Sequence, residues 1–387
     1  MPHFDWKINN EMNRRNLIKL GLYGTGALWA NLVVGSGRAA REPVQLLPPD
    51  RNGVRLPAGY SSRIVAESSV SPLGGCDYVW HAAPDGGACF ADQGGGWIYV
   101  SNSELGDAEG GAGALRFDAD GKLIDAYPVL QDTSQNCSGG ATPWGSWLSC
   151  EEIDDGRVWE CDPQGVEAAI VRPALGVFKH EAVAVDSLNR KLYLTEDQVD
   201  GCLYRFTPFN YPDLSAGKLE AARLINGETG KVEWQEIKDP LASRTETRFQ
   251  VSATRFNGGE GIAYFGGKVY FTTKGDNRVW VFDINSQVLS ILYDDCAYIN
   301  PVLTGVDNIT VSSDGSLYVA EDGGNMQVVV IANDGAIYPV LEMTGHDKSE
   351  IAGVAFSPDG SRLYFSSQRG KSGDELDGLT FEIHGPF

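Results

Sequence analysis

The chain has 387 residues, with 52 acidic and 31 basic side chains, a formal charge of −21 and 47 glycines. This excess of negative charge excludes a general nucleic-acid binder, because affinity for a phosphate backbone depends on clustered lysine and arginine. A hydrophobic fraction of 42 % is enough for a packed core, which excludes a disordered acidic protein. Glycine makes up about 12 % of the chain, against a usual ~7 %, and indicates many tight turns and a β-rich architecture.

The N-terminal segment has the pattern of an export signal. Arg14 and Arg15 precede a moderately apolar run over residues 20–35, and this arrangement resembles a twin-arginine signal. The run is shorter than the ~20 residues that a spanning helix needs, so we expect no stable membrane span. We therefore predict a signal peptide over residues 1–39, recognition by the twin-arginine export machinery, and a periplasmic or secreted mature protein. An uncleaved anchor is the alternative.

A repeat covers the rest of the chain. Its members share a turn signal followed by a short apolar strand, and they are GWIYVSNSE (96–104), GSWLSCEE (145–152), RKLYLTED (190–197), GKVYFTTK (267–274), GSLYVAED (315–322) and SRLYFSSQ (361–368). Their spacings are 48, 46, 77, 48 and 46 residues, and four of the five match the period of a four-stranded propeller blade. We predict an all-β fold, a six-bladed β-propeller forming one domain over 40–387, with an insertion within about 198–258.

Carboxylates recur at two positions of the repeat, at the start of its first strand and at the end of its second. The first set comprises Glu181, Glu260, Asp307 with Asn308, and Glu350. The second set comprises Asn102 with Glu104, Glu151 with Glu152, Glu196 with Asp197, and Glu321 with Asp322. The start of one antiparallel strand and the end of the next lie at the same edge, so both sets are expected at one mouth of the central channel. Crowded carboxylates repel unless cations neutralise them, and Ca²⁺ prefers such oxygen ligands. The alternative is that they are solvated loop acids.

The segment NCSGGATPWGSWLSCEE, residues 136–152, departs most from ordinary strand composition. Cys137 precedes a glycine pair at the start of an expected inner strand, and Glu152 ends the partner strand near the same edge. A thiolate beside carboxylates suits iron or zinc better than calcium. From the residues alone, a buried structural cysteine is the favoured interpretation, and a metal ligand is the alternative.

This segment, together with GVFKHEAV, TRFNGGEGIAYFGGKVYFTTK and EIAGVAFSPDGSRLYFSSQRG, resembles the bacterial PhoX-type alkaline phosphatase family. The resemblance covers most of 80–370, and the chain looks like a short member. It implies export by the twin-arginine route, a propeller with Fe³⁺ and Ca²⁺ clustered at one end of the channel, and hydrolysis of small-molecule phosphomonoesters. A metal-bound oxide or hydroxide would then be the nucleophile, so no side chain is assigned as catalytic.

The resemblance also implies site residues. The positions that match the family's metal ligands are Cys137, Glu152, Glu181, Glu260, Asn102 and the pair Glu196 and Asp197. Two residues before the glutamate that matches Glu260, members of the family commonly carry an arginine that contacts the substrate phosphate. This chain has Gly258 at that position. That departure bears on catalysis more than on metal binding, and Arg255 or Lys274 would have to reach the phosphate instead.

Three functions stay open at this point. The first is a metal-dependent phosphatase or phosphodiesterase of the PhoX type. The second is a calcium-dependent propeller lactonase. The sequence DNITVSSDGSLYVAED faintly resembles that class, whereas the segment around Cys137, residues 136–152, does not. The third is a non-catalytic exported propeller that binds metal. Metal content and substrate range separate the three.

Overall fold

The structure is a computed structural model that describes residues 44–387, so the predicted signal peptide lies outside the described residues. Regular structure within them is almost entirely β-strand, with 3-10 helices of three residues each, namely η1 (Gln93–Gly95), η2 (Pro173–Leu175), η3 (Thr247–Phe249), η4 (Asp295–Ala297) and η5 (Glu375–Asp377). Over the same range, no helix has the length and apolarity needed to cross a lipid bilayer.

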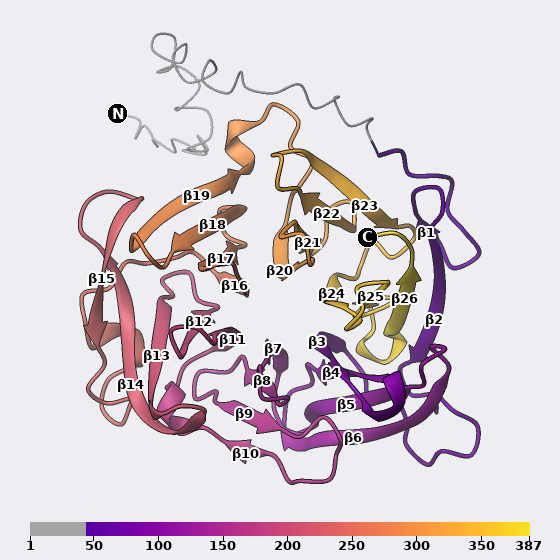
Figure 1. Ribbon diagram of the computed structural model, residues 1–387, viewed down its shortest axis with the longest axis horizontal. Helices are drawn as coiled ribbons and strands as arrows, with labels where there is room; N and C mark the ends of the chain where they lie inside the picture. Colours follow the sequence, from indigo (N-terminus) through magenta and orange to yellow (C-terminus); the bar gives the residue numbers. More distant parts are fainter. Residues whose placement is uncertain (1–43) are drawn as a thin grey trace, which may run out of the picture. The chain divides into compact units, whose positions relative to one another are not determined.

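The antiparallel sheets are arranged radially around a central axis (Figure 1). Six innermost strands contact one another in chain order, with the last against the first, and are β3 (Pro84–Ala91), β7 (Asn136–Ala141), β11 (His180–Asp186), β16 (Gly259–Phe265), β20 (Val306–Val311) and β24 (Ile351–Phe356). Their hairpin partners are β4 (Trp97–Ser103), β8 (Trp147–Glu151), β12 (Lys191–Glu196), β17 (Lys268–Thr273), β21 (Leu317–Glu321) and β25 (Arg362–Ser367). These partners coincide with the six repeated segments of the sequence.

Two further layers of strands lie outside each hairpin. The third strands are β5 (Gly110–Phe117), β9 (Val158–Cys161), β13 (Leu203–Asn210), β18 (Arg278–Asp283), β22 (Gln327–Ile331) and β26 (Leu379–His384). The outer strands are β6 (Leu123–Thr133), β10 (Ile170–Val171), β14 (Asp213–Leu224), β19 (Val288–Asp294), β23 (Ile337–Met343) and β2 (Ser61–Glu67), with β1 (Val54–Arg55) added beside β23. Because β2 pairs with β26, an early strand completes the last sheet and closes the ring.

The all-β propeller architecture is confirmed, but the described residues form five hydrogen-bonded sheets rather than six separate ones. The strand β15 (Gly230–Glu236) pairs with β14 and, through Gly230 and Lys231, with β19. Two groups of strands therefore share one nine-stranded sheet. No repeated pattern marks β15 in the sequence, so periodicity alone could not predict this link.

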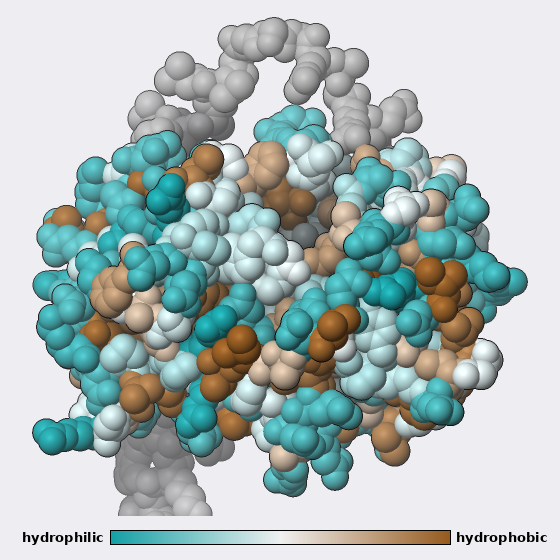
Figure 2. All heavy atoms as spheres, turned by 60° about the horizontal axis from the view of Figure 1, so that its bottom comes forward, coloured by the Kyte–Doolittle hydropathy of each residue, from teal (hydrophilic) through white to brown (hydrophobic). Residues whose placement is uncertain are grey.

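The aromatic residue at the centre of the repeated segment packs between neighbouring sheets. Tyr99, Tyr193 and Tyr364 are each fully buried, and the rings of Tyr99 and Tyr364 stack with centroids 4.8 Å apart. Burying one such side chain contributes about 2–3 kcal/mol. The outer surface differs: on the face in Figure 2, hydrophilic residues cover most of the area and hydrophobic ones lie in small groups. The sheets thus form a packed frame that fixes the inner strands around the axis.

Candidate functional site

Each inner strand has a register shift near its start. At each shift two residues between the paired positions have no partner across the hairpin. In five of the six strands the first of these two residues has an acidic or thiol side chain, and these residues are Asp85, Cys137, Glu181, Glu260 and Asp307. In β24 the shift comes later, and Ala352 stays paired with Ser366. A β-bulge leaves its extra residue unpaired and re-aims the side chain. The same irregularity, repeated around the ring, therefore directs five polar side chains to one place.

A second ring of side chains comes from the residues that directly follow the hairpin partner strands. Four are acidic and two are not, and together they are Glu104, Glu152, Asp197, Asp322, Lys274 and Gln368. Two of them contact the acids of the inner strands directly: Gln368 Nε2 donates to Asp85, and Lys274 Nζ lies 2.7 Å from Glu260 Oε1. Both ends of each hairpin thus contribute to the same mouth, as antiparallel pairing predicts.

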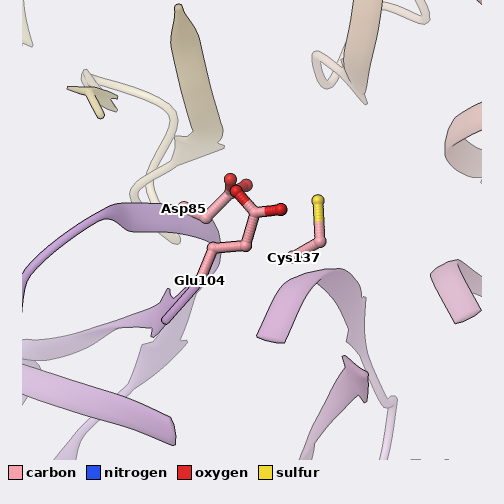
Figure 3. Close-up of side chains that lie close together, drawn as sticks. All are labelled: Asp85, Glu104 and Cys137. Atoms are coloured by element: carbon pink, nitrogen blue, oxygen red, sulfur yellow. The ribbon is translucent and has the colours of Figure 1, made fainter. Parts of the chain in front are cut away.

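Three overlapping groups of potential ligand atoms lie at this mouth. Within each group the atoms are no more than 4.8 Å apart, and the groups are Asp85, Glu104 and Cys137; Cys137, Glu152 and Glu181; and Glu181, Glu260 and Asp307. In Figure 3 the carboxyl groups of Asp85 and Glu104 lie together, with the Cys137 sulfur directed to the same space. We call these seven residues the axial acid centre. Because the groups share members, they form one continuous cluster.

Glu181 has a buried carboxyl group with few partners in the axial acid centre. It is 0 % exposed, Cys137 Sγ donates to its Oε1 at 3.4 Å, and its Oε2 has no hydrogen-bond partner. Burial raises the pKa of Glu181 well above its usual value, and the neighbouring Glu260 and Glu152 raise it further. A buried carboxylate oxygen without a donor is the arrangement that a bound cation completes.

The other acids of the centre are perturbed in the same direction. Burial, with Asp197 and Glu104 nearby, raises the pKa of Glu152 to about 8. Burial and Asp322 raise the pKa of Asp307 to about 7, although Lys274 opposes the change. These side chains hold their protons near neutral pH when no cation is bound, because charging several close carboxylates together is unfavourable.

Two predicted ligands, Glu196 and Glu321, turn away from the axial acid centre. Glu196 pairs with Arg248 at 3.2 Å and accepts a hydrogen bond from Tyr204 Oη at 2.8 Å. Glu321 accepts from the backbone N–H groups of Thr304 at 2.6 Å and Gln327 at 3.1 Å. Side chains alternate along a strand, so the residue after each of them faces the axis instead. Both glutamates stabilise the loops of their own sheets.

Asn102 is close to the centre but is fully engaged within the protein. Its Oδ1 accepts from Trp147 Nε1 at 2.9 Å and Ser149 Oγ at 2.8 Å. Its Nδ2 donates to the backbone carbonyls of Cys137 at 3.2 Å and Ser138 at 2.8 Å. These bonds use the full hydrogen-bonding capacity of the amide. Asn102 therefore holds the shifted segment of β7 that directs Cys137.

The two predicted phosphate-binding cations occupy different positions. The Arg255 guanidinium donates to Cys202 Sγ at 3.0 Å and to the Arg248 carbonyl at 2.8 Å, so it is committed outside the centre. Lys274 does reach the centre, and it pairs with Asp197 and Glu260 at 2.7 Å each. Of the two, only Lys274 lies where the sequence placed it.

Asp85 and Arg369 were not among the sequence candidates for the mouth. Asp85 lies in PDGG, a sequence typical of a turn, whereas Glu104 belongs to the second set of recurring acids. Arg369 pairs with Glu350 at 2.9 Å, and its Nη1 donates to Gln368 Oε1. A signal for Asp85 was present, because an acid or thiol before a glycine pair also occurs in the Cys137 string. No comparable signal marks Arg369.

Glycines lie where the inner strands approach one another beside the centre. A Cβ atom added to Gly86 would lie 2.4 Å from Ser138 Cα, and one added to Gly353 would lie 2.5 Å from the Asp85 carbonyl oxygen. Glycine thus lets the inner strands approach closely at this level. A cavity of 360 Å³ is lined by later residues of the inner strands, including Tyr264 and Phe356, but by none of the seven acid-centre residues. The axial acid centre is therefore not part of the lining of this cavity.

The fold and site define an all-β propeller protein with a buried acidic and thiol-bearing centre on its axis. A model of the family described as alkaline phosphatase PhoX matches residues 101–290 and 297–370. The chain therefore belongs to the alkaline phosphatase PhoX family, and this places it among phosphatases, the hydrolases of phosphoric esters.

Solved structures share the fold at low sequence identity. Pseudomonas fluorescens PhoX in complex with vanadate, a transition state analogue, aligns with a TM-score of 0.73 and 16 % identity, over 89 % of this chain and 98 % of that one. A gluconolactonase from Xanthomonas campestris aligns with a TM-score of 0.53 and 14 % identity, over 89 % and 99 % of the two chains. A search of curated protein sequences gave no match.

Proposed function

We propose that the chain is an exported, metal-dependent phosphatase that hydrolyses phosphomonoesters at the axial acid centre. The observation that carries this proposal is the recurring register shift, which directs an acid or a thiol from five inner strands into one buried space. A structural role alone would favour paired or solvated acids. Here the carboxyl groups crowd together, and Glu181 Oε2 lacks a partner within the protein.

The donor atoms fit two kinds of metal ion. Cys137 with Glu152 and Glu181 offers a thiolate beside carboxylates, which suits iron. Glu181 with Glu260 and Asp307 offers only oxygen atoms, which suits calcium. We therefore assign Fe³⁺ to the first group and Ca²⁺ to the second. When bound, the metal ions supply Lewis-acid chemistry, neutralising phosphate charge and activating a nucleophile.

Arg369 is the side chain that we assign to substrate phosphate, in place of Arg255. Its side chain is 31 % exposed, so it stands on the solvent side of the centre. Its Nη2 lies 2.9 Å from Glu350, and its Nη1 donates to Gln368, which in turn donates to Asp85 and Glu104. Planar guanidinium donors form paired bonds with phosphate oxygens. Arg369 would thus orient the ester, while Gln368 ties it to the acid centre.

The proposal extends to blade number and export. We propose six blades, on the ground that the nine-stranded sheet has an inner strand at each end, β11 and β16, and that β15 would then join two blades into one sheet. Residues 1–39 would act as the twin-arginine signal and residues 40–387 as the propeller domain. Asp197 is retained as a candidate ligand, whereas Asn102, Glu196 and Glu321 are assigned supporting roles.

The test compares Cys137→Ala with the matched control Cys150→Ala, since Cys150 is equally a buried cysteine but lies in the core of β8. Purified full-length protein is analysed for metal content and assayed on p-nitrophenyl phosphate, on bis(p-nitrophenyl) phosphate and on gluconolactone. We expect monoester hydrolysis that a chelator abolishes, and loss of both iron and activity in Cys137→Ala only.

Other outcomes identify the alternatives. Lactone hydrolysis with calcium alone would point to a propeller lactonase, and preference for the diester would point to a phosphodiesterase. Bound metal without hydrolysis of any of the three would point to a non-catalytic metal-binding protein. A protein that binds no metal, and that Cys137→Ala leaves unchanged, would overturn the assignment of the site.

A further inference from the structure

One position of the acidic ring carries a cation of the protein's own. Among the residues that follow the hairpin partner strands, Glu104, Glu152, Asp197 and Asp322 are acidic, whereas Lys274 follows β17. Its ammonium group lies inside the ring and not beside it, because Nζ is 2.7 Å from Asp197 Oδ2 and 2.7 Å from Glu260 Oε1. Lys274 thus bridges two carboxylates from neighbouring hairpins.

The two carboxylates that Lys274 contacts are themselves largely withdrawn from solvent. The Asp197 side chain is 14 % exposed. The Glu260 side chain is 3 % exposed, so its charge is poorly screened by water. An ammonium group that contacts two such carboxylates satisfies them electrostatically as a bound cation would.

The backbone next to Lys274 is shaped to receive this side chain. Gly258 has a φ of +70°, a region that favours glycine, and its carbonyl accepts a hydrogen bond from the Lys274 N–H at 2.9 Å. A Cβ atom at Gly258 would lie 3.0 Å from Lys274 Cγ and 3.2 Å from Asp197 Oδ1. The absence of a side chain at residue 258 therefore gives the lysine the room that it needs to reach the two carboxylates.

We propose that Lys274 is a resident cation that takes the place of a metal ion between Asp197 and Glu260, so that the chain binds one metal ion fewer than its acidic residues would otherwise hold. This inference rests on the proposed metal-binding role of the axial acid centre. It also assigns Gly258 a purpose, because glycine at that position makes the lysine's placement possible. Metal ions would then be held by the Cys137 side of the centre and by the remaining oxygen atoms.

The experiment measures Ca²⁺ binding by equilibrium dialysis and elemental analysis on the full chain and on two variants. Lys274→Met keeps the length of the side chain and removes its charge. Lys268→Met is the matched control, because Lys268 lies at the opposite, exposed end of the same strand β17. We expect Lys274→Met to bind about one more Ca²⁺ per chain than the unmodified protein, and Lys268→Met to bind the same number.

Thermal unfolding provides a second measurement, which stays informative if the variant is less stable than the unmodified protein. Without metal, Lys274→Met should unfold at a lower temperature than Lys274→Arg, which keeps the charge. Excess Ca²⁺ should raise the unfolding temperature of Lys274→Met more than that of Lys274→Arg or of the unmodified protein. Unchanged or lower Ca²⁺ content in Lys274→Met, with no larger Ca²⁺ response, would overturn the inference while leaving the metal centre intact. Failure of every form, the unmodified protein included, to bind metal would instead refute the proposed function.

Discussion

Replacing Glu181 by glutamine should have opposite effects on the metal-free and the metal-bound protein. In the metal-free protein Glu181 is 0 % exposed and its Oε2 has no partner, so this atom is a buried, unsatisfied acceptor. Such a group typically costs about 1–3 kcal/mol. The glutamine amide can donate to neighbouring carboxylates, so Glu181→Gln should raise the free energy of unfolding by about 1–3 kcal/mol at pH 8. For a long chain this is a rise in Tm of roughly 2–6 °C.

With metal present the sign should reverse. Removing a charged ligand is expected to weaken metal binding by at least about 100-fold, equivalent to about 2.7 kcal/mol. Metal that binds only the folded state stabilises it according to that affinity, so the variant should lose most of the metal-dependent rise in Tm. Calorimetry of the variant and the unmodified protein, each with chelator and with added Fe³⁺ and Ca²⁺, measures both effects.

Glu196→Gln is the matched control, because Glu196 is also 0 % exposed but is paired with Arg248 and Tyr204. Breaking a buried ion pair typically costs about 3–5 kcal/mol. This variant should therefore lose stability with and without metal, and its metal affinity should stay near that of the unmodified protein. If Glu181→Gln also destabilised the metal-free protein and kept the full metal-dependent rise in Tm, the interpretation of Glu181 as a metal ligand that lacks a partner in the metal-free protein would be refuted.

Three further predictions concern pH, substrate binding and residue 258. The raised pKa values of Glu152, about 8, and Asp307, about 7, mean that the folded state without metal binds extra protons, so this stabilisation is complete below about pH 4 and lost as pH rises through 7–8. The Tm of chelated protein should accordingly fall between pH 5 and pH 9, and a flat or rising profile would contradict the assigned burial. Arg369→Met should raise the KM for p-nitrophenyl phosphate about 10-fold or more with metal content unchanged, whereas an unchanged KM would exclude the arginine from phosphate binding. Gly258→Arg should lower Tm because its Cβ meets Lys274 Cγ at 3.0 Å, and adding Lys274→Ala should recover part of the loss; full stability of the single variant would contradict that contact.

The repeat was sufficient to predict the inner part of the fold. A turn signal and an apolar strand with an aromatic centre recur because each sheet must bury the same face against its neighbours. All six predicted segments are strands, and each is the hairpin partner of an innermost strand. The sharing of one sheet through β15 was not predictable, since it depends on the pairing of Gly230 and Lys231 with β19 in a region without repeat character.

The candidate site was predicted in part, and the gaps have local causes. Cys137, Glu152, Glu181, Glu260 and Asp307 come together as the phase of the repeat predicted. Glu196 was not separable from Asp197 by position in the repeat, because its partner Arg248 comes from a segment about fifty residues away in sequence.

The other differences between the expected and the observed positions of side chains reflect contacts that single-strand patterns do not encode. Asn102 was expected to bind metal, but Trp147 and Ser149 occupy its oxygen, and both belong to the next hairpin. Asp85 was overlooked because Pro-Asp-Gly-Gly is typical of a turn, whereas here it begins an inner strand. Arg369 lies after the last repeated segment, and its importance becomes evident only through Glu350 and Gln368.

The central claim is that the axial acid centre binds metal ions and that one of them is iron bound by Cys137. Anomalous diffraction from crystals of protein exported through its own N-terminal segment, collected on both sides of the iron absorption edge, tests it most directly. We predict an iron peak bonded to Cys137 Sγ, with calcium positions among the carboxylates of Glu181, Glu260 and Asp307. An absence of anomalous signal at Cys137, with the carboxylates bonded only to one another and to water, would contradict the claim.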